Sequence, residues 1–145
     1  MEVRAAIDRM VRWWTYDPQM GIMSGLIQSG RLSIISSDLL RNALASCPSR
    51  VQDLVEDEIF VQQVTANQLE PFISDTVAMR NIVSYADVGG SRFTASLARL
   101  LTDQKFENLV YLKLGLTLGV LEEYEGLAAE ITAIKELIEI ASKAR

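Results

Sequence analysis

The C-terminal part of the chain, from Asp103 to Ser142, repeats apolar residues at intervals of three and four. This spacing predicts one long amphipathic helix over residues 103–142. The residues assigned to its inner face are Phe106, Val110, Leu114, Thr117, Leu121, Tyr124, Ala128, Ile131, Ile134, Ile138 and Ala141. At a rise of about 1.5 Å per residue the helix would be about 60 Å long, so part of it is expected to pack against a partner chain or to project as a stalk. Glycines at 115, 119 and 126 would let another helix approach closely.

Two short helices are predicted at the start of the chain. The first follows Val3, Ile7, Met10, Val11 and Trp14, which recur at helical spacing. It should stop before Pro18, because proline disfavours helical backbone in the residue that precedes it. Asp17 is then expected to cap a second helix that runs from Pro18 to about Gln28.

The stretch SGLIQSGRLSIISSDLLRNALA, residues 24–45, crowds turn-forming and helix-capping residues together. Ser29 and Gly30 predict a glycine cap on the second helix, and Ser36 or Ser37 predicts an N-cap for the next one. The loop between them is expected to turn Leu32, Ile34 and Ile35 inward. A strand over residues 31–35 would need a partner strand, and the sequence offers none.

Two prolines are expected to divide the central helices. Pro48, within Ser46-Cys47-Pro48-Ser49, predicts the end of a third helix and the start of a fourth over residues 49–83. Pro71 predicts a kink or break between Thr65 and Pro71. The inner faces of these helices are assigned to Leu39, Leu40, Ala43 and Leu44, and to Val51, Leu54, Val55, Ile59, Val61 and Val64.

A short helix is predicted within residues 93–101, and Thr102 or Asp103 is predicted to cap the long C-terminal helix. The sequence thus predicts one all-α domain over residues 1–145. We expect an irregular, mostly antiparallel bundle of about six helices, with a proline-bent central helix and a long C-terminal helix.

Composition argues against several functions. The 145 residues are 49% hydrophobic and 23% charged, with a net charge of −5 and scattered Lys and Arg, so nucleic acid is not an expected partner. There is no histidine, which removes the commonest acid–base group and metal ligand. No apolar run is long enough to span a bilayer, and the N-terminal residues lack the apolar core of a secretory signal.

The chemical motifs favour structural interpretations. The single cysteine, Cys47, is predicted to be a buried structural thiol. The acidic runs at 56–58 and 122–125 are predicted to be solvated helix faces, and Gly89-Gly90 is predicted to be a loop, because no Lys-Ser/Thr follows at the phosphate-binding spacing. We therefore expect no enzyme activity, no catalytic or metal-binding residue and no cofactor.

Five residues are candidates for contacting a ligand or partner. Trp13, Trp14 and Tyr16 form an aromatic cluster, which more often anchors a core than cages a ligand. Arg31 and Arg41 could hold an anion, although a surface salt bridge is the commoner role for such arginines. Whether a small molecule binds here is unknown from the sequence.

Two long runs carry a resemblance to a known class of proteins. They are TYDPQMGIMSGLIQSGRLSIISSDLLRNALASCPSRVQDLVEDE and LLTDQKFENLVYLKLGLTLGVLEEYEGLAAEITAIKELIE. Together they resemble helical domains of unknown function in bacterial membrane-anchored proteins. The resemblance implies an anchor helix upstream of Met1 and a domain on the periplasmic side of the inner membrane.

Two functions follow as expectations. The first is a non-catalytic extracytoplasmic interaction or sensing module, bound to the membrane only through the upstream anchor. The second is a cytoplasmic helical adaptor or assembly protein that dimerises through its long C-terminal helix.

Overall fold

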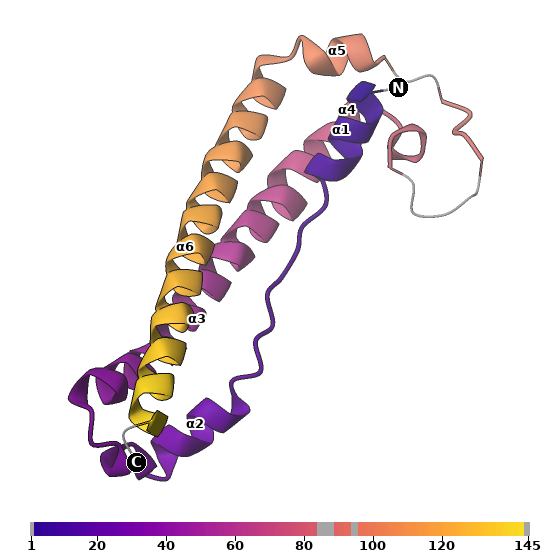
Figure 1. Cartoon of the computed structure of the whole chain (residues 1–145). Helices are drawn as coiled ribbons and strands as arrows, with labels where there is room; N and C mark the ends of the chain where they lie inside the picture. Colours follow the sequence, from indigo (N-terminus) through magenta and orange to yellow (C-terminus); the bar gives the residue numbers. More distant parts are fainter. Residues whose placement is uncertain (1, 84–88, 94–95, 144–145) are drawn as a thin grey trace. The chain divides into compact units, whose positions relative to one another are not determined.

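A computed structural model describes residues 2–83, 89–93 and 96–143, and it contains helices but no strand among them (Figure 1). This confirms the predicted all-α class. The α-helices are α1 (Glu2–Met10), α2 (Gly21–Gln28), α3 (Asp38–Val64), α4 (Glu70–Thr76), α5 (Leu97–Leu101) and α6 (Gln104–Lys143). Between them lie the 3-10 helices η1 (Arg31–Ile34) and η3 (Met79–Asn81), and the π-helix η2 (Thr65–Leu69).

The chain divides into two compact units. Unit 1 comprises Met1–Trp14 and Glu58–Leu118, and unit 2 comprises Thr15–Asp57 and Gly119–Arg145. The core of unit 1 is formed by Ile7, Val11, Leu69, Ile73, Val77, Ile82, Val83, Leu100, Phe106 and Leu109. The core of unit 2 is formed by Leu40, Leu44, Cys47, Val51, Leu54, Leu127 and Ile134. In unit 2, the start of α3 lies beside the end of α6, so the two helices run antiparallel there.

The long C-terminal helix α6 is confirmed, but part of its predicted inner face is wrong. Leu114, Leu121, Ile131 and Ile138 are between 43% and 52% exposed. The buried side instead follows an interval of seven residues. Phe106 and Lys113 mark it in unit 1, and Val120, Leu127, Ile134 and Ala141 mark it in unit 2, all of them buried or half-buried. An interval of seven is the repeat of helices that pack along a shared seam.

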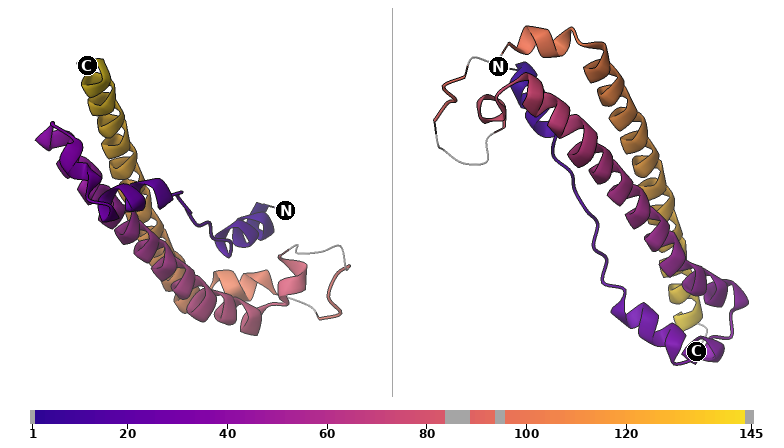
Figure 2. Two further views of the ribbon diagram at one scale, coloured as in Figure 1. Left: turned by 90° about the horizontal axis from the view of Figure 1, so that it is seen from below. Right: turned by 180° about the vertical axis from the view of Figure 1, so that it is seen from behind.

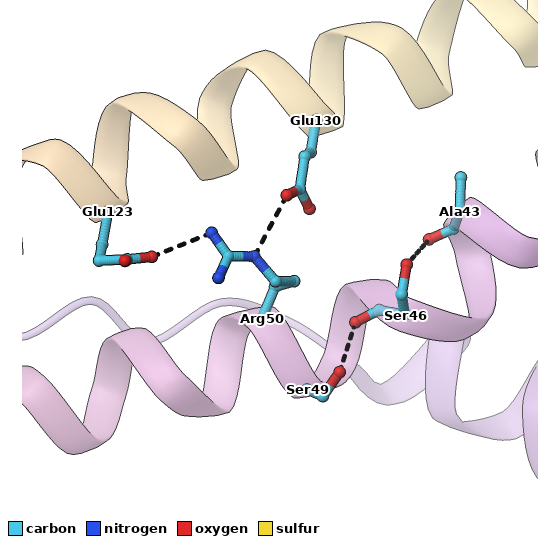
Figure 3. Close-up of polar contacts among 6 residues, drawn as sticks. All are labelled: Ala43, Ser46, Ser49, Arg50, Glu123 and Glu130. Carbon is cyan, nitrogen blue, oxygen red and sulfur yellow. Dashed lines mark hydrogen bonds and ion pairs between the residues drawn. The ribbon is translucent and has the colours of Figure 1, made fainter.

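The third helix does not end at Pro48, as the sequence predicts, because α3 continues through it from Asp38 to Val64. Ser46 Oγ donates to Ala43 O over 3.1 Å, and Ser49 Oγ donates to Ser46 O over 2.8 Å, on either side of the proline (Figure 3). The buried residues Leu40, Leu44, Cys47, Val51 and Leu54 keep intervals of four and three across it. Burial of this unbroken apolar stripe outweighs the hydrogen bond that proline cannot make.

Between Thr65 and Pro71, where the sequence predicts a kink or break, the chain stays helical but forms the π-helix η2. The Glu70 amide donates to Thr65 O, five residues back. A regular three-four pattern after Thr65 would bury Gln68, but Gln68 is exposed and Leu69 is fully buried. A π turn takes up one additional residue, so it restores Leu69 and Ile73 to the core side. The fourth helix then ends at Thr76 and not at residue 83, because Val77 has extended backbone angles.

Three further residue assignments on α3 are wrong. Ile59, placed inside by the sequence, is 43% exposed, whereas Glu58, placed on a solvated face, is 4% exposed. The core side of α3 is therefore one residue out of step with the prediction at this place. Leu39 is also exposed, at 67%, whereas Leu40 and Leu44 lie on the core side as predicted.

The N-terminal helices are shorter than predicted. Helix α1 ends at Met10, so Trp14 lies outside it and is 84% exposed. Helix α2 begins at Gly21, so its N-cap position is Met20 and not the predicted Asp17, and the Met20 amide donates to Pro18 O over 2.9 Å in a tight turn before the helix. Figure 2 shows the run between α1 and α2 as chain without helix.

The predicted corner at residues 28–41 is confirmed in its capping. Gly30 has a φ of +69°, a left-handed conformation that glycine adopts without strain, and Ser37 Oγ accepts from the Leu40 amide over 3.3 Å. The loop itself forms η1, and Ile34 is 68% exposed where the sequence predicts an inward side chain. Leu32 and Ile35 do pack against the unit 2 core.

The segment before α6 also follows its predicted capping. Asp103 Oδ1 accepts from the Lys105 amide over 2.8 Å, which makes Asp103 the N-cap of α6. Ser96 caps α5. Gly89 and Gly90 are not helical, and Gly89 has a φ of +72°. Residues 84–88 of the predicted loop and residues 94–95 of the predicted short helix lie outside the described residues.

Candidate interaction surfaces

The aromatic candidates do not anchor a core. Trp13 is 43% and Trp14 is 84% exposed, and both lie in the non-helical run that follows α1. Tyr16 packs edge-to-face against Tyr124 of α6, with ring centroids 5.8 Å apart and an angle of 74° between the rings. This geometry is the favourable one for two aromatic rings, so Tyr16 serves to attach the chain to α6 in unit 2.

The arginine candidates differ from each other. Arg41 Nη2 donates to Ile35 O over 2.6 Å, and Nη1 lies 2.8 Å from Asp38 Oδ1. These contacts hold the loop before α3 against the helix start, which is the structural role that the sequence favours for such an arginine. Arg31 is exposed in η1.

A cross-helix ion cluster, which the sequence does not reveal, lies in unit 2 (Figure 3). Arg50 on α3 reaches Glu123 Oε2 at 2.9 Å and Glu130 Oε1 at 3.2 Å, both on α6. The two carboxylates raise the pKa of Arg50, Glu123 more than Glu130. Glu123 and Glu130 are one seven-residue interval apart, so they point to the same side of α6, and that interval is the signal that could have paired them.

Near this cluster, Cys47 is buried, as predicted. Burial, and next the negative charge of Glu130, raise the pKa of its thiol above the ordinary 9.0. A thiol held protonated in this way is a poor nucleophile. We therefore interpret Arg50, Glu130 and Cys47 as structural groups.

A buried lysine occupies unit 1. Lys113 is 8% exposed, and its Nζ donates to Met10 O and, over 3.3 Å, to Arg12 O. Burial lowers its pKa below the ordinary 10.5, and the charge of Glu70 acts in the opposite direction. Lys113 thus turns inward and caps the C-terminal end of α1.

With Lys113 turned inward, the opposite side of α6 is apolar from Tyr111 to Leu118. We call this side the outer face of α6, and its residues are Tyr111 (77% exposed), Leu112 (42%), Leu114 (52%) and Leu118 (51%). Tyr111, Leu114 and Leu118 are three and four residues apart, the spacing of a helical seam. No charged residue lies between Lys113 and Leu121. The outer face of α6 is the strongest candidate interaction surface in unit 1.

Unit 2 carries an open apolar groove of about 750 Å³. It lies between the loop that precedes α3 and the last turns of α6, and it is lined by Ile34, Ile35, Ser36, Ser37, Leu40, Leu137, Ile140, Ala141 and Ser142. Ile34 and Ile140 at its edges are 68% and 66% exposed. None of the described residues that line the groove is charged, so the groove suits an apolar side chain and not an anion.

The described residues contain no group of three or more His, Cys, Asp or Glu side chains placed to hold a metal ion. Among the same residues, no helix has the length and apolar character needed to cross a membrane.

Comparisons of the chain with protein-family models, with curated proteins and with solved structures find no match. The surfaces above are thus the basis for a functional proposal.

Proposed function

We propose that this chain is a non-catalytic helical interaction module that binds a second copy of itself along the outer face of α6. The observation that carries the proposal is the exposure of Tyr111, Leu114 and Leu118 at helical-seam spacing. Apolar side chains of this size, grouped on one face, are characteristic of a surface that a partner covers.

The charge pattern favours a second copy as the partner. Only Lys113 is charged between residues 108 and 121, and its ammonium is directed at α1. Two copies can therefore bring their outer faces together without opposing like charges, despite the net charge of −5. The acidic residues Glu122, Glu123 and Glu125 begin directly after this stretch and would limit the contact to it.

Sedimentation equilibrium of the full chain tests the proposal. We expect concentration-dependent dimers for the wild type and monomers for Leu114→Glu combined with Leu118→Glu, because the two carboxylates would be buried without partners. Ala129→Glu, at an exposed position on the same helix, is the matched control and should dimerise as the wild type does. A wild type that stays monomeric at high micromolar concentration would contradict the proposal.

The cellular setting is a separate proposal that rests on the resemblance alone. We propose that the module is held on the periplasmic side of a membrane by an upstream anchor, with a cytoplasmic adaptor as the alternative. Fractionation of the full-length native protein decides between them: recovery in the membrane fraction supports the first, and recovery as soluble cytoplasmic protein supports the second.

A further inference from the structure

Helix α1 contacts the rest of unit 1 like a bound peptide. Ile7 in α1 and Val11, the residue directly after this helix, are 3% and 1% exposed, and the Val11 amide still donates to Ile7 O, so the two side chains share one face. Both belong to the same core as Leu69 and Ile73. Residues 2–6, by contrast, are all exposed. The attachment of α1 thus depends on two apolar side chains, with Met10 packed partly against the same core.

The receiving surface also recognises the end of a helix. The last carbonyls of a helix have no partner within the helix. Lys113 Nζ donates to one such carbonyl, that of Met10, and also to Arg12 O, two residues beyond α1. A buried lysine is costly unless it is partnered, and here its partners are backbone oxygens at and just after the end of α1. The receiving surface therefore combines two apolar contacts with a cation that fits a helix C-terminus.

The tether of α1 allows it to leave. Residues 12–15 form no helix and no strand and are exposed, and Tyr16 beyond them attaches the chain to α6, so this short run is the linker to α1. Helix α1 has nine residues, which is too short for a stable isolated helix, although Arg12 and Asp8 pair at 3.0 Å across one turn. Contacts with the rest of unit 1 stabilise α1, so the free energy needed to release it should be little more than the free energy of the contacts described above.

We infer that the surface of unit 1 that α1 covers is an exchange site, which accepts the α1 of a second copy in place of its own. An exchanged α1 would make the same contacts to Leu69, Ile73 and Lys113, and such swaps of identical elements are a low-cost route to dimers. This site is distinct from the outer face of α6, and it does not depend on that proposal.

A fluorescein-labelled peptide of residues 2–14, titrated into the full chain by fluorescence anisotropy, tests the inference. In the wild type the resident α1 competes at an effective concentration of about 1 mM, as for any short flexible linker. Replacing Ile7→Ser and Val11→Ser in the chain removes this competitor, so we expect peptide binding at least about tenfold tighter than in the wild type. A chain with Ala5→Ser, at an exposed position of α1, should bind as weakly as the wild type.

Two controls define the contact. The same peptide with both serine replacements should not bind, and Lys113→Met in the chain that already carries Ile7→Ser and Val11→Ser should weaken binding of the native peptide. The inference is overturned if the native peptide does not bind that doubly substituted chain, or if the substituted peptide binds it equally well.

If the doubly substituted chain loses its helical circular dichroism, hydrogen exchange of the wild type decides. Exchange of α1 amides by local opening, well before those of α4 and α6, supports a releasable α1. Exchange of α1 only together with α4 and α6 overturns it.

Discussion

Replacing Pro48 by alanine should stabilise this protein. Pro48 lies inside α3, where it supplies no amide to Leu44 O and its ring crowds the preceding turn. Alanine restores that hydrogen bond and removes the crowding. The sequence alone predicts no such gain, because it places Pro48 between the third and fourth helices, where a missing amide costs little.

The expected gain follows from two opposing contributions. Proline in a helix interior is about 3 kcal/mol less favourable than alanine. Alanine also gives the unfolded chain more freedom, which returns about 0.4–1 kcal/mol. The net stabilisation is therefore about 2 kcal/mol, equivalent to a rise in Tm of about 4–8 °C for a chain of this size.

Urea unfolding followed by circular dichroism at 222 nm measures this change as a shift of the midpoint at constant slope. Pro18→Ala is the matched control. Pro18 lies in the non-helical run between α1 and α2, where it interrupts no helix, so we expect no gain and a loss of at most about 1 kcal/mol. A Pro48→Ala protein equal to or less stable than the wild type would refute the continuous α3.

Three further predictions concern burial and charge. Leu54→Ala should destabilise the chain by about 2–5 kcal/mol in urea unfolding, and Leu39→Ala, at a 67% exposed position, by no more than about 0.5 kcal/mol; equal effects would contradict the assigned face of α3. The thiol pKa of Cys47 is raised in the fold, so the contribution of this thiol to the stability of unit 2 should be constant below the ordinary pKa of 9.0 and should fall as the pH rises above it. Hydrogen exchange measures this fall, and Cys47→Ala should abolish it. Because the pKa of Lys113 is lowered, the stability of unit 1 should instead rise with pH toward 10.5, and this rise should disappear in Lys113→Met.

Three helix caps were predictable from the sequence, whereas the ends of α1, α3 and α4 and the start of α2 were not. Gly30, Ser37 and Asp103 cap helices where the sequence places caps, because a cap depends on a few neighbouring residues. The length of α6 was equally accessible, since its periodic pattern runs from one cap to the end of the described helix. Both signals depend on residues that are close together in the sequence, and the structure agrees with both.

The faces of the helices were less predictable. Around Lys113, α6 carries apolar residues on both sides, so the pattern alone cannot say which side is buried. Because the charged Lys113 itself lies on the buried side, the pattern favours the opposite side as the core side, which is wrong. Pro48 was misread because its local preference for ending a helix is overridden by tertiary burial of Cys47 and Val51 on either side. Nothing in the pattern distinguished the exposed Trp14 from a core residue, because its exposure follows from the end of α1 at Met10.

Self-association along the outer face of α6 can be tested most directly by disulfide trapping. Leu114 lies near the middle of this face, so two copies would bring residue 114 close to its counterpart in either a parallel or an antiparallel pairing. A disulfide requires Cα atoms about 4.4–6.8 Å apart, and the native Cys47 is buried and should not compete. We predict that Leu114→Cys gives covalent dimers under mild oxidation much faster than Ala129→Cys on the same helix. Equal rates for the two variants would contradict the proposed interface.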